Sequence, residues 1–263
     1  MTSDGLERSG VADGIRVGII GLASAYAALY AEALAEMEAA NLVAVCTFGR
    51  DDRFLSHAMA GLPTDRYPTS SSGFAERYGV DVHEDPSVFF DESAVDAVVV
   101  CTEDTLRVRP AVVALSRGIH VYMPKPFATS LEEAMLLFQA SREGRAFVTP
   151  SLPLRHHPAY RAAKELIDGS RLGDVQTGHL TPSQHLELGS WRSDPSLASG
   201  PEISVAFDVF DALLWLLGDG PSSLTAYAAN LEHHGVPFID TAKALLRLSR
   251  GGLASADFLL GTH

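Results

Sequence analysis

Short apolar runs alternate with longer amphipathic segments through the first half of the chain. The runs are rich in valine and isoleucine, and most are followed by a segment with helical spacing. Strands that are apolar throughout and separated by helices are typical of a parallel sheet covered on both faces. The pattern predicts strands at 15–20, 42–48, 80–83, 97–102, 119–123 and 146–149, and helices at 24–39, 105–116 and 130–143.

The pattern changes near Pro150, where we predict a domain boundary. Beyond it the spacing predicts helices at 158–168 and about 204–217, with a strand near 175–183 between them. Three strand-like runs follow, and Arg250-Gly-Gly252 joins the last two as a hairpin turn would. These runs lie at 224–230, 241–248 and 253–260.

Composition and charge exclude several classes of function. The chain has 263 residues, 46% of them apolar, and a net charge of −13, which suits neither nucleic acid nor an anionic membrane surface. Cys46 and Cys101 lie in apolar runs and are expected to be buried thiols. No run approaches a membrane span and the N-terminus lacks an apolar signal core, so a cytoplasmic protein is expected.

Lys125 stands between two prolines just after the strand predicted at 119–123. Proline fixes its own φ and restricts the residue before it, so the backbone here is stiff and extended. Open α/β sheets bind ligands beyond the carboxyl ends of their strands, which makes Lys125 a candidate site residue. A solvated surface lysine is the alternative.

Several motifs in sequence order resemble those of the Gfo/Idh/MocA oxidoreductases. They include Arg16-Val-Gly-Ile-Ile-Gly-Leu, Val121-Tyr-Met-Pro-Lys-Pro126, Leu154-Arg-His-His-Pro-Ala-Tyr160 and Asp208-Val-Phe-Asp-Ala-Leu-Leu-Trp-Leu-Leu-Gly218. The resemblance implies a Rossmann-type doubly wound parallel sheet over 1–150. It also implies an α+β domain with an open, mainly antiparallel sheet over 151–263. Family members usually carry further strands, so the chain resembles a divergent, C-terminally shortened member.

The first predicted strand leads into the position of a dinucleotide fingerprint, for which Gly18, Gly21, Ala23 and Ser24 are the candidate residues. The fingerprint asks for glycine at 23, where the backbone approaches the pyrophosphate, and for a small residue at 26. Ala23 and Tyr26 occupy those positions. The cofactor is expected to be NADP or NAD.

The end of the second predicted strand decides between these two cofactors. An acid there would bind the ribose of NAD, but the strand ends in Thr47-Phe-Gly-Arg50. Thr47 and Arg50 could hold a 2′-phosphate, which favours NADP. Where the family tends to have Thr-Pro-Asn, this chain has Thr102 and Glu103 followed by Asp104, and the first two are further candidates for cofactor contacts together with Lys125.

The resemblance places an aspartate and, four residues later, a catalytic histidine on the apolar helix of the second domain. Alignment through Trp215-Leu-Leu-Gly218 puts Ser204 and Asp208 at these positions, so Asp208 replaces the histidine. Lys125 and Asp208 are the expected catalytic pair, with His156 as a further candidate. The alternative is that Asp208 and Asp211 are only polar residues on an otherwise buried helix.

The candidate substrate contacts are Arg155, His157, His185, Trp191 and Asp211. A core or interface role for Trp191 stays open. No His or Cys spacing supports a metal site, and His233 and His234 are expected to lie solvated in a loop.

The leading hypothesis is an NAD(P)-dependent oxidoreductase that acts on a hydroxyl or carbonyl group of a sugar-like or cyclic polyol substrate. One alternative is a catalytically degenerate member that serves as a partner subunit or ligand-binding protein. A second is non-redox elimination or isomerisation in the same cleft. We also expect a homodimer or homotetramer joined through the C-terminal sheet, because such a sheet would not leave an apolar face in water.

Overall fold

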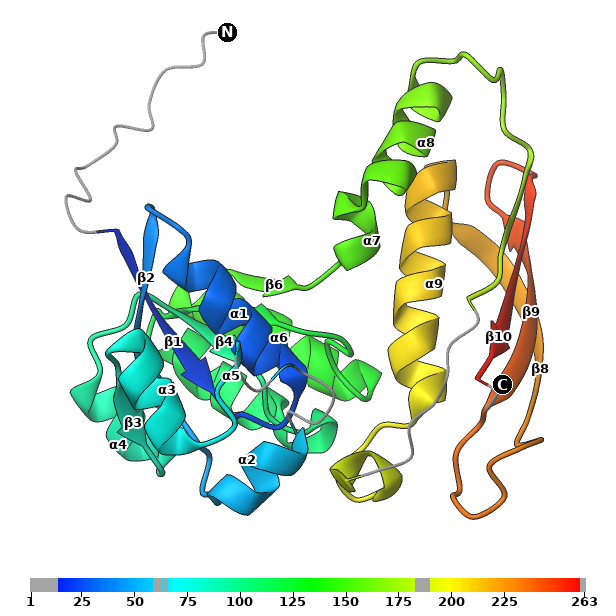
Figure 1. Ribbon diagram of the computed structural model, residues 1–263. Coiled ribbons are helices and arrows are strands. Elements are labelled where there is room, and N and C mark those ends of the chain that lie inside the picture. Colours follow the sequence, from blue (N-terminus) through cyan, green and yellow to red (C-terminus); the bar gives the residue numbers. More distant parts are fainter. Residues whose placement is uncertain (1–13, 59–62, 64–65, 183–189, 261–263) are drawn as a thin grey trace, which may run out of the picture. The chain divides into compact units, whose positions relative to one another are not determined.

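The computed structural model describes residues 14–58, 63, 66–182 and 190–260 (Figure 1). The chain forms two compact units. The first contains the residues up to Met123 together with Met135–Thr149, and the second contains Pro124–Ala134 and the chain from Pro150 onward.

The first unit is built on a six-stranded sheet in the order β3-β2-β1-β4-β5-β6. Neighbouring strands from β3 to β5 pair in parallel, as the uniformly apolar runs predict. The strand order reverses between β1 and β4, and doubly wound sheets bind ligands at such a reversal. The strands are β1 (Ile15–Ile20), β2 (Ala40–Cys46), β3 (Asp81–His83), β4 (Ala97–Val100), β5 (His120–Met123) and β6 (Val148–Pro150).

Helices connect these strands, and three of them were not predicted. The unpredicted helices α2 (Asp52–Ala58), α3 (Ser71–Tyr78) and α4 (Pro86–Glu92) are short, so they show little periodicity. Their caps are the stronger signal, since the Ser70 hydroxyl accepts from the backbone of Gly73 and begins α3. The others are α1 (Ala25–Ala35), the 3-10 turn η1 (Asp104–Leu106), α5 (Val108–Ser116) and α6 (Leu131–Gly144).

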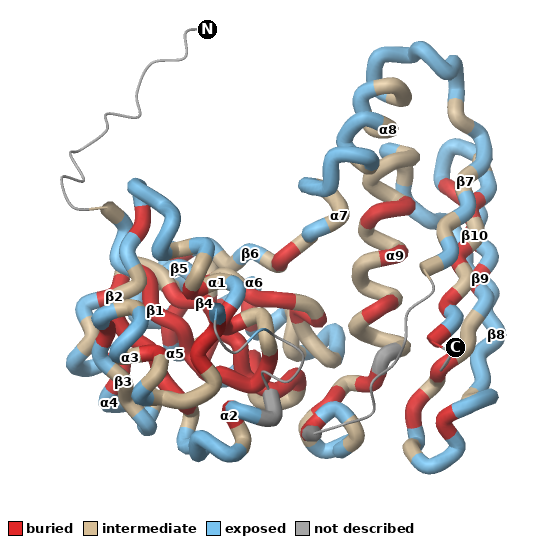
Figure 2. The backbone as a smooth tube through the Cα atoms, viewed as in Figure 1, coloured by how far each residue is buried: buried red, intermediate tan, exposed pale blue. Residues whose placement is uncertain are grey.

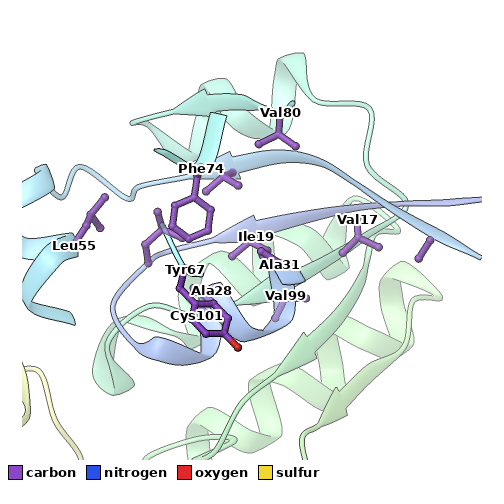
Figure 3. Close-up of a cluster of buried hydrophobic side chains, with 14 residues drawn as sticks. Val17, Ile19, Ala28, Ala31, Leu55, Tyr67, Phe74, Val80, Val99 and Cys101 are labelled. Atoms are coloured by element: carbon purple, nitrogen blue, oxygen red, sulfur yellow. The ribbon is translucent and has the colours of Figure 1, made fainter. Parts of the chain in front are cut away.

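The core of the first unit lies between the sheet and its helices. Figure 3 shows Val17, Ile19 and Val99 from the strands packed with Phe74 of α3 in one cluster. Both cysteines are buried thiols, as predicted. Burial raises the pKa of Cys46 to about 11 and that of Cys101 to about 12, which keeps both thiols protonated at neutral pH.

The second unit packs one long helix on a four-stranded sheet in the order β7-β10-β9-β8. The hairpin of β9 and β10 is antiparallel, as predicted, and so is the pair of β8 and β9, while β7 joins β10 in parallel. The sheet is therefore mixed. The elements are α7 (Pro153–His156), α8 (Pro158–Asp168), β7 (Thr177–Leu180), the 3-10 turn η2 (Ser190–Ser193), α9 (Pro201–Leu217), β8 (Pro221–Ala229), β9 (Thr241–Leu248) and β10 (Leu253–Leu259).

The apolar side of α9 forms the core of this unit. Val205, Val209 and Leu213 recur at helical spacing and pack against buried side chains of β9 and β10, among them Leu246 and Phe258. The opposite face of the sheet is exposed, and β8 is exposed along its whole length (Figure 2). In the part of the chain that the structure describes, no helix is long and apolar enough to cross a membrane.

The loop between β8 and β9 is held by a buried aspartate. Asp240 is 1% exposed and its carboxylate accepts backbone N–H groups from Leu231, Glu232 and His233, each at 2.9 Å. His233 is itself buried, with Nδ1 3.2 Å from Asp240 Oδ2, so the expectation that it is solvated was wrong, whereas His234 is exposed. Burial by itself would raise the pKa of Asp240, but the backbone donors outweigh it and the pKa lies below its usual range.

We predict that Asp240→Asn lowers the free energy of unfolding at pH 7 by about 1–3 kcal/mol, because buried N–H groups lose a charged acceptor. A depressed carboxyl pKa adds stability above the unfolded value of about 3.9, and this is lost as pH falls. The deficit of the variant should therefore shrink in urea unfolding below about pH 4. The exposed Asp174→Asn is the control, and equal stability of both variants at pH 7 would contradict this account.

Candidate functional site

The turn after β1 touches the end of β4 so closely that only glycine fits. A Cβ atom on Gly21 would lie 2.5 Å from Thr102 Cγ2 and 2.6 Å from Thr102 N, and its φ of +82° is left-handed. The Ala23 N–H donates to the Cys101 carbonyl at 3.0 Å and fastens the turn to β4. Close backbone approach at this position is what the first glycine of a dinucleotide fingerprint provides.

Helix α1 begins directly after this turn. The buried Ser24 is its N-cap but makes no side-chain capping bond, and the first turn carries no acidic residue. The partial positive charge of a helix N-terminus suits a phosphate group there. The ring of Tyr26 stacks on that of Tyr30 along the helix, with centroids 6.1 Å apart, and packs against the core.

Gly18 has a packing role in the structure. It lies inside β1, where a Cβ atom would come within 2.4 Å of the Phe89 ring. The missing side chain therefore lets the buried Phe89 of α4 pack against the sheet, and this contact explains why a glycine stands at position 18.

A tight turn at the end of β2 positions Arg50. Phe48 and Gly49 both have positive φ, 60° and 71°, and the Arg50 N–H donates back to the Thr47 carbonyl at 3.2 Å. The left-handed conformation is strained for phenylalanine, and such strain gathers at binding sites. The guanidinium group of Arg50 lies 4.9 Å from the centre of the Phe54 ring.

An acid from the loop after β4 contacts this turn. Arg50 forms an ion pair with Oε1 of Glu103, whose side chain is 1% exposed. Glu103 Oε2 and Thr47 Oγ1 are buried, and neither has a hydrogen-bond partner among the described residues. The sequence has no acid at the tip of β2, because the carboxylate comes from 53 residues further along the chain.

The loop after β4 is itself tied down. The buried Arg107 donates to the Thr102 carbonyl at 3.0 Å and to Asp104 at 3.2 Å. No role was predicted for this pair, although opposite charges three residues apart were a signal for it. The loop therefore holds Thr102 and Glu103 in fixed positions.

In the second unit, Lys125 and Asp208 form an ion pair as the sequence analysis expected. The Lys125 amine donates to Asp208 Oδ2, and the two side chains are 16% and 13% exposed. Asp208 Oδ1 is buried without a hydrogen-bond partner in the described chain. The pair thus joins a cation just after β5 to an acid on α9 and leaves one carboxylate oxygen available.

A second ion pair lies one turn further along α9. Arg155 binds Asp211 through two bonds, Nε to Oδ2 at 2.9 Å and Nη2 to Oδ1 at 2.6 Å. The hydrogen bonds to Asp211 raise the pKa of Arg155, which stays charged. Its guanidinium carbon lies 5.9 Å from the centre of the Trp215 ring. Asp208, Asp211 and Trp215 follow helical spacing, so these contacts share one side of α9.

The other predicted site residues with described positions lie on α7, at the start of α8 and on η2. His156 is exposed at the end of α7, and His157 Nδ1 accepts the Ala159 N–H at 3.3 Å and caps α8. Trp191 is buried, 6% exposed, in η2. His185 lies outside the described residues. Among the residues with described positions, no three His, Cys, Asp or Glu side chains group so as to hold a metal ion.

The comparisons with known proteins agree with this architecture. Residues 15–151 match the family described as "Oxidoreductase family, NAD-binding Rossmann fold", and residues 160–260 match the "GFO/IDH/MocA C-terminal domain". The chain belongs to the Gfo/Idh/MocA oxidoreductase family, which confirms the resemblance and the predicted fold class.

Two relatives show the range of the family. An inositol 2-dehydrogenase from Saccharopolyspora erythraea is 30% identical over 71% of this chain and 54% of its own length. A 2,7-anhydro-N-acetylneuraminate hydratase from Mediterraneibacter gnavus is 25% identical over 66% of this chain and 47% of its own length. The chain thus spans about half the length of these relatives.

Solved structures share the fold. The WlbA dehydrogenase from Chromobactrium violaceum, solved in complex with NADH and UDP-GlcNAcA, superposes with a TM-score of 0.81 at 21% identity. The match covers 95% of this chain and 68% of the other. It therefore extends over both units of the present fold.

We predict that Lys125 and Asp208 are energetically coupled. In a double-mutant cycle of Lys125→Ala and Asp208→Ala, unfolding should give a coupling energy of about 1–3 kcal/mol, because the pair is largely desolvated. The more exposed pair of Lys164 and Asp168 on α8 should give about 0.5 kcal/mol or less. Equal coupling in the two cycles would show that the Lys125–Asp208 contact is weak in solution.

Proposed function

We propose that this chain is an NAD(P)-dependent oxidoreductase that acts on a hydroxyl or carbonyl group of a sugar-like or cyclic polyol substrate. The observation that carries the proposal is the ion pair of Lys125 and Asp208, with one carboxylate oxygen buried and unpaired in the described chain. Family membership and the glycine turn at Gly21 support a dinucleotide as the redox partner.

The residues present fit such a cofactor. The Gly21 turn and the α1 N-terminus would hold the pyrophosphate, and the turn at Thr47 and Arg50 would lie at the adenosine ribose. The nicotinamide ring, when bound, supplies the hydride acceptor or donor. Family membership supports NAD or NADP. The sequence predicted tighter binding of NADP from Thr47 and Arg50, but in the structure Arg50 is already paired with Glu103.

The protein's own groups would handle the proton. Removing a hydride from an alcohol carbon requires a base for the hydroxyl proton, and Asp208 Oδ1 is available for it. Lys125, held on the other carboxylate oxygen, would orient the substrate oxygen and stabilise negative charge on it. In the direction of carbonyl reduction the same two groups would return the proton.

Further polar groups on α7 and α9 would position the substrate. Arg155, with Asp211 on one side and the Trp215 ring nearby, presents fixed donors and an aromatic face. Hydroxyl groups of a sugar suit such donors, and the apolar face of a sugar ring suits an aromatic side chain. Two alternatives are a partner-subunit role and non-redox elimination. One relative is named as a hydratase, which is consistent with elimination chemistry in the family. The following test separates these alternatives.

We predict that Asp208→Asn lowers turnover roughly a hundredfold or more, since it keeps the shape of the side chain and removes the base. Lys125→Ala should do the same without unfolding the protein. The assay follows the absorbance of the reduced nicotinamide cofactor at about 340 nm over a panel of polyols and sugars. Lys164→Ala on α8 is the control.

The outcomes of this assay separate the alternatives. Turnover that survives Asp208→Asn would contradict the proposed mechanism. Product formed without any change in cofactor absorbance would favour elimination or isomerisation. A folded parent protein that turns over no substrate in the panel would favour the partner-subunit role.

We also propose that the protein forms a homodimer or homotetramer through the sheet of the second unit. The large apolar side chains exposed on the face opposite α9 include Tyr227 at 80%, Leu245 at 57%, Leu253 at 45% and Leu259 at 40%. A second copy would remove this surface from water. Charged groups at Lys243 and Asp257 share the face, so the surface is amphipathic.

We predict that Leu245→Glu shifts the protein toward monomer in sedimentation velocity at micromolar concentration, because it places a charge in the apolar surface. Leu224→Glu is the matched control, since Leu224 is 52% exposed but pairs with the inward-facing Leu246 and so points to the other face. A parent protein that sediments as a monomer would contradict the proposed association.

A further inference from the structure

Glu103 brings a buried carboxylate to the tip of β2, although it belongs to the loop after β4. Its side chain is 1% exposed, and only Oε1 is engaged, by Arg50. Oε2 is buried and has no hydrogen-bond partner in the described part of the chain. Leaving a buried carboxylate oxygen without a donor is costly, which indicates that a bound molecule supplies the donor.

The surroundings of this oxygen suit a hydroxyl-bearing ligand. Thr47 Oγ1, one turn away from Arg50, is also buried without a partner among the residues described. The Thr47–Arg50 turn itself is held by the bond from the Arg50 N–H to the Thr47 carbonyl. A buried acceptor and a buried hydroxyl at the end of β2 match the hydroxyl groups of a ribose.

We propose that Glu103 binds the ribose hydroxyls of the adenosine half of the cofactor and that its pair with Arg50 makes the site select NAD over NADP. This inference rests on the proposed function, since it requires that a nicotinamide dinucleotide binds. From the loop after β4, Glu103 would thereby perform the role that an acid at the end of β2 performs in dinucleotide-binding folds.

The charges at the site account for the selection. The 2′-hydroxyl of NAD donates a hydrogen bond, which Glu103 Oε2 can accept. The 2′-phosphate of NADP is anionic and would face a buried carboxylate, while the positive charge of Arg50 is already matched by Glu103. If Arg50 turned to the phosphate, it would leave Glu103 buried and unpaired, which is also unfavourable.

The test is isothermal titration calorimetry of the full-length protein with NADH and NADPH, with no substrate present. We expect the parent protein to bind NADH at least roughly tenfold more tightly than NADPH. Glu103→Gln should weaken NADH and strengthen NADPH, because Arg50 is released to the phosphate, so the preference falls or reverses. Glu76→Gln on the exposed side of α3 is the control and should leave both affinities unchanged.

A second probe tests the parent protein alone and does not depend on the folding of a variant. NADH that lacks the 2′-hydroxyl of its adenosine ribose should bind roughly tenfold more weakly than NADH, because Glu103 Oε2 loses its donor. Equal affinity for these two probes, or tighter binding of NADPH than NADH, overturns the inference and leaves the proposed function standing. A folded parent protein that binds neither cofactor overturns the proposed function and the inference together.

Discussion

The missing side chain at Gly21 is the constraint on which the first unit's candidate site depends. A Cβ atom there would overlap the backbone nitrogen of Thr102, so any other residue would force β1 and β4 apart at their carboxyl ends. The bond from Ala23 to Cys101 closes the same gap. Because the turn lies against β4, α1 begins at the reversal in strand order and the loop carrying Glu103 comes close to the end of β2.

Three ion pairs share a common arrangement around the candidate sites. In each, a cation on a loop or short helix is held by an acid distant in the sequence: Arg50 by Glu103, Lys125 by Asp208, and Arg155 by Asp211. The first two leave a buried carboxylate oxygen with no partner in the described structure. Pairing fixes the geometry of the cation, and we propose that the remaining oxygen accepts a hydrogen bond from a ligand.

The sequence predicted what depends on local patterning and missed what depends on distant contacts. Uniformly apolar strands and the helical spacing of α9 were sufficient to predict the layers, because burial follows periodicity. The flanking prolines and the strand end indicated Lys125, and the resemblance led to Asp208. The short helices α2 to α4 bury too few residues to show a period. The contact of Glu103 with Arg50 and the burial of His233 by Asp240 arise only when the chain is folded, so no local pattern signals them.

We propose that the turn after β1 and the tip of β2 bind one dinucleotide, which hydrogen–deuterium exchange can test. Exchange of the intact protein with and without NADH should show protection in peptides that cover Gly21–Ala25 and Thr47–Arg50, because a bound cofactor would contact both backbone turns. Peptides from β8 should not change. Unchanged exchange in both turns at saturating NADH, or protection confined to other parts of the chain, would contradict the account.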